Sequence, residues 1–577
     1  MCGIAGISLS KENKILQKKF RKMRKLLKHR GPDGDGIFEY KNISLIHTRL
    51  SIIDIKNGTQ PIKSKNNVLV ANGEIYNDLE IRKKFTKFKF STKSDSESIL
   101  ALYENEGVRG FEKLRGMYSF ALYDKNLDQL IISRDEFGIK PIYFTTMIDG
   151  FFFSSELNAL KKVITEKKKI DDKKVIEHLK FQYCSGNRTI YKGINRLRPG
   201  ESLIIKNGKI TRSIFKKLTP KKNIICTEKF VEKKILDSVS SHLRSDVPYC
   251  LFFSGGIDSM LLLYSIKALG IKNIKAYTIN FVEKKKSFNL ENICEENNIK
   301  LHIESFSEED FWNYIFFAAE NIDEPLADYA ILPTFKLAKR ASKEFKIAIT
   351  GEGGDELFGG YGRYKKTKRL LFSKKKNKGL FSSSNFFKDY RNLKLEHHDK
   401  KKYFDFDNLS SIQSSQIFDY KNWLPNNLLV KLDRCLMTYG MEGRTPFIDK
   451  DLFNSLFYIS DNNKVRNGFG KYYIRNLLSK KIINYDAFAP KQGFTVPIYE
   501  WIPKKINLIE KHLLKLKFLS PFFSREQLLF LCKNIKKNKK IVKSIWHIIF
   551  FSSWYLIHVE GLKNRGNYFE VMKKVNG

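Results

Sequence analysis

The chain has 577 residues, of which 42% are hydrophobic. This length exceeds what one hydrophobic core supports and predicts two or three domains, and the apolar content excludes wholesale disorder. The formal net charge of +43 raises the question of a nucleic-acid or membrane partner. The lysines, however, lie in short runs throughout the chain, without the interleaved aromatic residues or module of a nucleic-acid binder. We therefore expect a solvated basic surface and neither a nucleic acid nor a membrane as partner.

Seven cysteines are spread over the chain without a CxxC pair, which argues against a disulfide framework and against a zinc or iron–sulfur site. The first residues lack the apolar core of a signal peptide. The most apolar late stretch, 544–559, falls short of the ~20 residues that span a bilayer and is predicted to be a buried helix. We expect a cytoplasmic protein in a reducing compartment.

Short β-type runs separated by Gly, Asn and Asp dominate residues 2–212, which we take as the first domain. The predicted strands are 3–9, 43–50, 68–72, 117–123, 129–133, 142–145 and 150–154. Their alternation favours an antiparallel α+β arrangement over βαβ units. The pair Asn207-Gly208 indicates a hairpin near the end of this domain.

A polar, basic stretch at 213–226 is interpreted as a linker. From Thr227 onwards helix and strand signals alternate, with an apolar strand at 249–253, a helix at 261–269 and further strands at 276–281 and 347–350. This order is typical of a doubly wound α/β domain, which we place at 227–500. Residues 501–577 are predicted to be a helical extension of that domain.

Cys2 becomes the first residue of the chain once the initiator Met is removed. Its thiol then lies beside a free α-amine, whose unperturbed pKa of about 8 makes it a usable general base. One residue can thus supply both nucleophile and base. A cysteine at this position can equally be a small buried residue, so the hypothesis depends on the motifs that follow.

Four motifs accompany Cys2: His29-Arg30-Gly31-Pro32-Asp33-Gly34, the segment 47–54, Asn72-Gly73-Glu74-Ile75-Tyr76-Asn77, and Ser94-Asp95-Ser96-Glu97. Together they resemble the class II glutamine amidotransferase domain. The resemblance covers the first third of the chain and implies an N-terminal-nucleophile fold, an αββα sandwich. The segment 134–141 matches a further family segment and is expected near the domain interface.

The resemblance assigns glutamine chemistry to the matching positions. Arg49 can bind an α-carboxylate through two hydrogen bonds, and Asp95 can pair with an α-ammonium. The side chain of Asn72 and the backbone N–H of Gly73 can form an oxyanion hole. The expected glutamine-binding set is Arg49, Leu50, Ser51, Ile52, Ile53, Asn72, Gly73, Glu74 and Asp95.

A second signal is Ser254-Gly255-Gly256-Ile257-Asp258-Ser259, which lies between an apolar strand and a helix. Such a turn presents hydroxyls and backbone N–H groups to a pyrophosphate. It lacks the Gly-Lys-Ser/Thr of the Walker motif and resembles the pyrophosphate loop of enzymes that adenylylate a substrate with ATP. Asp258 would hold Mg²⁺ against the phosphates, because hard oxygen ligands suit that ion.

The segment 350–361 resembles a motif of the asparagine synthetase family. This resemblance links Glu352 to adenylate formation and ammonia attack, gives Asp355 a part in the Mg²⁺–phosphate cluster, and makes Lys491 neutralise charge on the phosphate. The expected ATP-binding residues are Phe252, Ser254, Gly255, Gly256, Asp258, Ser259, Ile279, Thr350 and Gly351. The pair 433–434 and the segment 442–449 complete the family pattern and are interpreted mostly as scaffold.

The two halves, in this order, resemble the glutamine-hydrolysing asparagine synthetases of the B type over nearly the whole chain. The resemblance implies a ligase in which Cys2 attacks the side-chain amide of glutamine and leaves a thioester that water hydrolyses to glutamate. The second domain converts the acceptor, aspartate, to an acyl-AMP. Ammonia then travels through the protein and attacks the acyl-AMP, giving asparagine, AMP and pyrophosphate.

Four positions leave the acceptor open. Tyr329-Ala330 replaces a Pro-Ser pair common in the family, and Leu436 and Gly440 stand where the family tends to have serines. Because recognition of a small zwitterion depends on placed polar groups, a second hypothesis is amidation of another carboxylate, such as a sugar uronate of a surface polysaccharide. Further hypotheses are a nucleic-acid-modifying enzyme and a catalytically silent relative. The oligomeric state also stays open, with a homodimer as one option.

Overall fold

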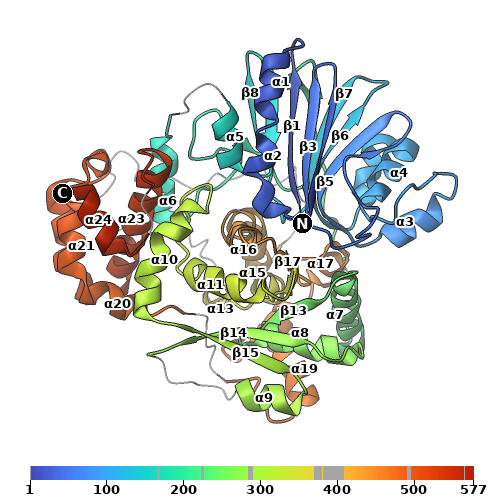
Figure 1. Cartoon of the computed structure of the whole chain (residues 1–577). Coiled ribbons are helices and arrows are strands. Elements are labelled where there is room, and N and C mark those ends of the chain that lie inside the picture. The colour runs from blue at the N-terminus through green and yellow to red at the C-terminus, as the bar shows by residue number, and fades with distance from the viewer. Residues whose placement is uncertain are drawn as a thin grey trace.

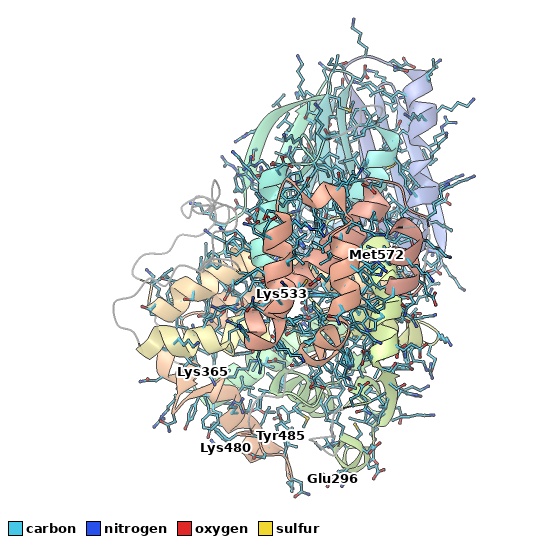
Figure 2. The ribbon with its side chains drawn as sticks, turned by 90° about the vertical axis from the view of Figure 1, so that its left-hand side faces the viewer. Glu296, Lys365, Lys480, Tyr485, Lys533 and Met572 are labelled. Carbon is cyan, nitrogen blue, oxygen red and sulfur yellow. The ribbon has the colours of Figure 1, made fainter. Side chains whose placement is uncertain are left out.

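The computed structural model describes residues 2–164, 169–222, 226–283, 290–369, 380, 409–489, 495–563 and 566–576. A β-rich N-terminal half lies above a mixed α/β half, and the C-terminal helices flank the latter (Figure 1). In a view turned by 90°, Lys533 and Met572 mark this helical layer in front of the other elements (Figure 2).

Two six-stranded sheets form the N-terminal half, in the orders β10-β8-β9-β1-β3-β2 and β12-β11-β7-β6-β5-β4. All their strand pairs are antiparallel. The strands are β1 (Gly3–Leu9), β2 (Gly34–Tyr40), β3 (Ile43–Arg49), β4 (Ile62–Lys63), β5 (Asn67–Ile75), β6 (Gly116–Asp124), β7 (Gln129–Arg134), β8 (Tyr143–Met147), β9 (Gly150–Ser154), β10 (Asn195–Arg196), β11 (Glu201–Lys206) and β12 (Lys209–Phe215).

The two sheets pack face to face because alternate residues of each strand point into a shared apolar core, as Leu45 and Val70 do. The outer face of the first sheet is covered by α1 (Lys14–Phe20), α2 (Met23–Leu26) and α5 (Leu157–Val163). The outer face of the second is covered by α3 (Asp78–Lys84) and α4 (Glu97–Glu106) (Figure 1). The predicted αββα sandwich is confirmed.

The hairpin between β11 and β12 turns at Asn207 and Gly208, whose φ angles of 47° and 72° suit a two-residue turn with positive φ at both positions. The strand β12 continues to Phe215, so the expected linker, 213–226, begins inside a strand. The strand is extended because Ile214 and Phe215 pack against neighbouring apolar clusters.

A five-stranded sheet, in the order β15-β14-β13-β16-β17, forms the second half, and all its pairs are parallel. The strands are β13 (Tyr249–Phe252), β14 (Lys275–Phe281), β15 (Lys300–Phe306), β16 (Ile347–Ile349) and β17 (Glu442–Arg444). The order reverses between β13 and β16, which confirms the predicted doubly wound domain. A crevice at the carboxyl ends of these two strands is where such folds bind ligands.

Helices lie on both faces of this sheet. One face is covered mainly by α7 (Glu228–Leu243), α8 (Ile257–Ala268), α17 (Lys450–Leu456) and α19 (Tyr472–Lys481). The other is covered by α10 (Glu308–Glu320), α11 (Ile331–Ala341) and α16 (Leu429–Met437). The remaining elements near the site are α9 (Leu290–Glu296), α12 (Gly354–Phe358), α13 (Gly362–Arg369), α15 (Ser411–Phe418), the π-helical η4 (Asp419–Leu428) and α18 (Asp461–Lys464).

The C-terminal helices are α20 (Ile498–Lys504), α21 (Ile506–Leu513), α22 (Arg525–Lys533), α23 (Lys539–His558) and α24 (Tyr568–Asn576). The predicted buried helix at 544–559 is confirmed as the larger part of α23, which packs against α10 and α6 (Asp172–Phe181). Within the described ranges, no helix is long and apolar enough to cross a membrane. The indole of Trp546 is fully buried and donates to the Ala327 carbonyl at 2.8 Å.

Replacing Trp546 with Ala removes this indole and leaves the Ala327 carbonyl without its donor. We expect the free energy of unfolding of the C-terminal half to fall by about 3–5 kcal/mol, measured by chemical denaturation. The matched control is Phe530→Ala. Phe530 lies on α22 and is 53% exposed, so this change should alter the free energy of unfolding by less than about 0.5 kcal/mol. Equal losses in both variants would contradict the packing described for α23.

Candidate active sites

Cys2 directly precedes β1 and is buried against the end of β5. Its backbone nitrogen donates to Asn72 Oδ1 at 3.0 Å, and its carbonyl accepts from Arg30 Nε at 3.1 Å. Burial raises the pKa of the Cys2 thiol, and the backbone N–H of Leu50 opposes this shift. Because the thiolate is the nucleophile, a thiol in this position needs a base to react.

Asn72 and Gly73 lie side by side on β5, with Asn72 fully buried. Asn72 Oδ1 binds the nitrogen of Cys2, while Asn72 Nδ2 has no hydrogen-bond partner among the described residues. A buried donor of this kind is costly unless a ligand accepts from it, as an oxyanion does. A Cβ on Gly73 would lie 2.0 Å from the Met117 carbonyl oxygen, so only glycine fits there.

Arg49 ends β3, and the loop that follows it holds its guanidinium. Arg49 Nη1 donates to the Ile55 carbonyl at 3.0 Å, and Nη2 donates to that of Asp54 at 2.6 Å. Leu50 and Ile52 are buried in the apolar cluster shared with the α/β half, so their side chains pack at the domain interface. Of the expected glutamine-binding set, these two can therefore offer only backbone groups.

Two carboxyl groups, those of Glu74 and Asp95, are buried close together. Asp95 Oδ2 accepts from the Ile75 N–H at 2.6 Å, and burial nevertheless raises the pKa of Asp95 to about 6. Burial and the neighbouring Asp95 raise the pKa of Glu74 well above its usual range. Arg444 Nη2 lies 3.2 Å from Glu74 Oε1 and partly offsets this negative charge. A bound ammonium group would offset it further.

A cavity of about 490 Å³ opens at the carboxyl ends of β13 and β16. All nine residues expected to bind ATP line it: Phe252, Ser254, Gly255, Gly256, Asp258, Ser259, Ile279, Thr350 and Gly351. Its volume is that of an ordinary small-molecule site. Tyr485 and Lys365, labelled in Figure 2, are among its lining residues.

The turn at 254–259 passes from β13 into α8. Gly255 has a φ of 73°, and a Cβ there would lie 2.3 Å from Leu290 Cδ2. Ser259 Oγ donates to the Gly256 carbonyl at 3.0 Å and lies 3.3 Å from Ser254 Oγ. Backbone N–H groups and both hydroxyls thus gather at the amino end of a twelve-residue helix, where anions bind favourably.

The carboxylates of Asp258 and Asp355 both line the cavity, and both contact the ammonium group of Lys471. Lys471 Nζ lies 2.6 Å from Asp355 Oδ1 and also contacts Asp258. Proteins bind Mg²⁺ with one or two carboxylates plus substrate phosphates. The paired carboxylates of Asp258 and Asp355 are therefore suitable ligands for this ion. In the described part of the chain, no group of three or more His, Cys, Asp or Glu side chains could hold a metal. Lys471 lies outside every sequence motif described above and was not predicted from the sequence.

Glu352 lies on the loop after β16, and Lys431 Nζ is 3.7 Å from its Oε1. Burial raises the pKa of Glu352, and the charge of Lys431 opposes the shift. Asp328 Oδ2 lies 3.1 Å from the same ammonium group. Lys491 lies outside the described residues.

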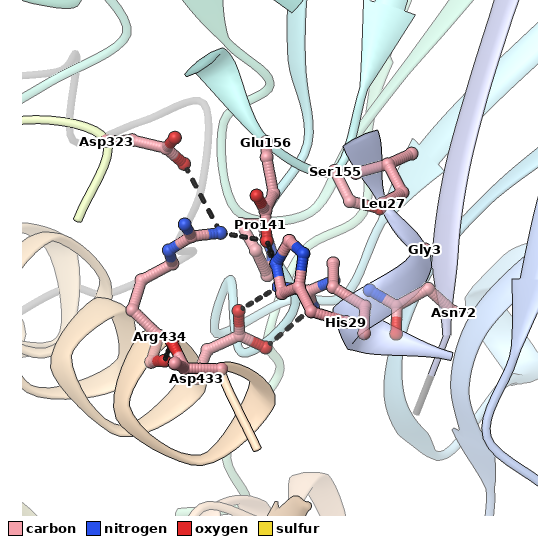
Figure 3. A network of polar contacts seen from close by, with 12 residues as sticks. Gly3, Leu27, His29, Asn72, Pro141, Ser155, Glu156, Asp323, Asp433 and Arg434 are labelled. Atoms are coloured by element: carbon pink, nitrogen blue, oxygen red, sulfur yellow. Dashed lines mark hydrogen bonds and ion pairs between the residues drawn. The ribbon is translucent and has the colours of Figure 1, made fainter. Parts of the chain in front are cut away.

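Buried ion pairs join the two halves of the molecule (Figure 3). Arg30 Nη1 and Nη2 bind the two oxygens of Asp433 at 2.8 and 3.1 Å, and Arg30 Nη1 lies 3.2 Å from Glu156 Oε1. Arg434 also contacts Glu156, and it lies 3.8 Å from Asp323. Both Asp433 and Arg434 thus reach across the interface, in keeping with the mostly structural role expected for them.

Arg444 on β17 contacts both candidate sites. Its guanidinium is fully buried and lies 3.2 Å from Glu74, while its carbonyl accepts from the Thr350 N–H at 2.9 Å. Arg444 Nε also donates to Glu442 Oε1 at 2.6 Å. One residue of the segment 442–449 thus touches a predicted glutamine-binding residue and a predicted ATP-binding residue.

Leu436 and Gly440 are not among the described residues that line the cavity. Leu436 is buried in an apolar cluster, and a Cβ on Gly440 would lie 3.2 Å from Pro32 Cγ in the other half of the chain. Gly440 has a φ of 63°, where a serine would be strained. These two positions thus serve packing and the interface, whereas Tyr329 and Ala330, the other two departures from the family pattern, line the cavity.

Comparison with known proteins gives matches over both halves. Residues 1–216 match the family model of the glutamine amidotransferase domain, and residues 231–556 match that of asparagine synthase. Asparagine synthetase [glutamine-hydrolyzing] 1 of Bacillus subtilis is 30% identical over 97% of this chain and 97% of its own length. Asparagine synthetase B of Escherichia coli is 26% identical over 87% of this chain and 83% of its own.

Arg30→Met would leave Asp433 buried without its main partner. We expect the free energy of unfolding to fall by about 3–5 kcal/mol, because an uncompensated buried charge costs more than the pair contributes. The control is Arg21→Met, which removes a solvent-exposed pair with Glu39. The control should leave the denaturation midpoint unchanged, and a similar shift in both variants would count against the interface described.

Proposed function

Because the chain belongs to the family of glutamine-hydrolysing asparagine synthetases, we propose that this ligase transfers ammonia from glutamine to the side-chain carboxylate of aspartate, with ATP as the energy source. The products would be asparagine, glutamate, AMP and pyrophosphate. One observation carries the proposal: buried Asn72 holds the nitrogen of Cys2 with one amide atom and keeps the other for a ligand. We assign glutamine hydrolysis to residues 2–215 and synthesis to 227–577, in a cytoplasmic enzyme.

In the glutaminase step, Cys2 Sγ attacks the amide carbon of glutamine while the freed nitrogen of Cys2 takes the thiol proton. Asn72 Nδ2 and the Gly73 N–H stabilise the oxyanion. Collapse of the intermediate breaks the C–N bond, and the proton leaves with ammonia. Water then hydrolyses the thioester to glutamate. Arg49 binds the α-carboxylate through its remaining N–H groups, and Asp95 and Glu74 surround the α-ammonium.

In the synthetase step, the phosphates of ATP lie over the turn at 254–259. The aspartate carboxylate attacks the α-phosphorus and displaces pyrophosphate. Asp258 and Asp355 would hold Mg²⁺, which neutralises charge on the phosphates when bound. We keep Lys491 as a proposed partner of the phosphates. We propose that Glu352, whose pKa is raised by burial, takes a proton from the attacking ammonia.

Ammonia must stay neutral to attack the acyl-AMP, so we propose that it passes through the protein interior. The support is that Arg444 touches Glu74 with its guanidinium and Thr350 with its carbonyl. Arg444 is itself fully buried, so a continuous stretch of buried protein runs from Glu74 to Thr350. The relatives do not favour a uronate acceptor. Of the four positions that depart from the family pattern, Tyr329 and Ala330 line the cavity, and Leu436 and Gly440 do not.

Cys2→Ala should abolish glutamine-dependent AMP release, because no nucleophile remains, and should keep ammonia-dependent AMP release within about twofold of the original chain. Initial rates with aspartate and either nitrogen donor measure this. Cys226→Ala, which removes a half-buried free cysteine of the other half, is the control and should change neither rate. Unchanged glutamate release in Cys2→Ala would exclude Cys2 as the nucleophile. Absence of aspartate-dependent turnover in the original chain would exclude the proposed acceptor.

Glutamine binding should weaken as the pH falls through about 6, because burial raises the pKa of Asp95 to about 6 and only the ionised carboxylate pairs with the α-ammonium. Calorimetric titration of Cys2→Ala, which binds without hydrolysis, should show Kd rising about tenfold between pH 7 and pH 5. Asp95→Asn should bind weakly at both values. A pH-independent Kd in Cys2→Ala would remove Asp95 from the ammonium site.

A further inference from the structure

Three charged side chains meet on the wall of the ATP cavity away from the pyrophosphate turn. Asp328 precedes α11, Glu352 follows β16, and Lys431 lies in the first turn of α16. Lys431 Nζ lies 3.1 Å from Asp328 Oδ2 and 3.7 Å from Glu352 Oε1. All three residues line the cavity, and no step proposed above uses Asp328 or Lys431.

This pair is nearly enclosed by protein. The side chains of Lys431 and Asp328 are 8% and 13% exposed. Burial works against the ammonium form, but Asp328 and Glu352 outweigh it and raise the pKa of Lys431. A buried ion pair seldom stabilises a protein more than apolar residues of the same size would. Its position on a cavity wall points instead to a ligand with charges of both signs.

We infer that Asp328 and Lys431 recognise the α-ammonium and α-carboxylate of the acceptor and thereby select an α-amino dicarboxylate. The inference rests on the proposed function and names the residues that set its specificity. With its head group between Asp328 and Lys431, aspartate carries its side-chain carboxylate only two carbon–carbon bonds away, beside Glu352.

Charge balance favours such a zwitterion. When it binds, the Asp328–Lys431 contact is exchanged for two contacts with the substrate, so each buried charge keeps a partner. A dicarboxylate without an ammonium group adds negative charge and leaves Asp328 beside it uncompensated. A sugar uronate has the same defect, because hydroxyls replace the ammonium group.

The local backbone also explains why this site works with Ala330, where the family tends to have a serine. The backbone N–H of Ala330 donates to Asp328 Oδ1 at 3.0 Å, and the Ala330 carbonyl accepts from Thr334 Oγ1 at 2.7 Å. Asp328 is therefore oriented by a main-chain donor on one oxygen and by Lys431 on the other. A hydroxyl at position 330 is not required to fix it.

The test compares three acceptors, with ammonia as nitrogen donor and pyrophosphate release as readout. Succinate lacks the ammonium group of aspartate, and 3-aminopropanoate lacks its α-carboxylate. In the original chain, kcat/KM for aspartate should exceed both by at least about 100-fold. Asp328→Asn should reduce the aspartate-to-succinate ratio at least about tenfold, and Lys431→Met should do the same to the aspartate-to-3-aminopropanoate ratio.

Lys336→Met is the matched control, because Lys336 pairs with Asp310 at 2.8 Å and does not line the cavity. It should leave all ratios unchanged. A purely structural role for Asp328 and Lys431 would slow all three acceptors equally and keep the ratios constant, which would overturn the inference. If aspartate supports no pyrophosphate release with the unsubstituted enzyme, the proposed function itself is refuted.

A further measurement needs no variant. Succinate and 3-aminopropanoate are tested as competitive inhibitors of aspartate in the original chain. Both should bind at least about 100-fold more weakly than aspartate. Inhibition constants close to the KM of aspartate would overturn the inference even if the variants failed to fold.

Discussion

The fully buried guanidinium of Arg30 joins the two halves of the molecule. It binds the carbonyl of Cys2, which we propose as the nucleophile, and both carboxylate oxygens of Asp433. Asp433 lies on α16, the helix that also carries Lys431 beside Glu352. A buried charge tolerates little displacement from its partners, because each lost contact leaves it desolvated and unpaired. Arg30 therefore fixes the position of one candidate site relative to the other.

This constraint matters because of the chemistry proposed for the two sites. Ammonia released into water near neutral pH becomes ammonium and can no longer act as a nucleophile. Arg444, which touches Glu74 on one side and Thr350 on the other, adds a second rigid link. Both links consist of buried guanidinium groups with several acceptors, a geometry that lysine could not reproduce. The interface thus holds the two candidate sites in a fixed relative position.

The sequence predicts those features that depend on local pattern. Alternating strands, the Asn207-Gly208 hairpin, the turn at 254–259 and the long apolar helix α23 all follow from residues close together in the chain. The interface cluster could not be predicted in the same way, because its members are far apart in the chain and charge alone does not identify a partner. For the same reason, the contacts of Lys471 with two carboxylates and of Gly440 with Pro32 could not be predicted. The roles proposed for individual residues remain predictions, including that of Lys491, which lies outside the described residues.

Transfer of labelled nitrogen tests the central claim most directly. The enzyme is supplied with aspartate, ATP and saturating glutamine labelled with ¹⁵N in its amide, together with unlabelled ammonium at a concentration that supports measurable turnover of Cys2→Ala. The ¹⁵N content of the asparagine amide is then measured by mass spectrometry. Internal transfer between two sites held together by Arg30 predicts asparagine labelled as fully as the glutamine supplied. Dilution of the label to the isotopic composition of the bulk ammonia pool would contradict it.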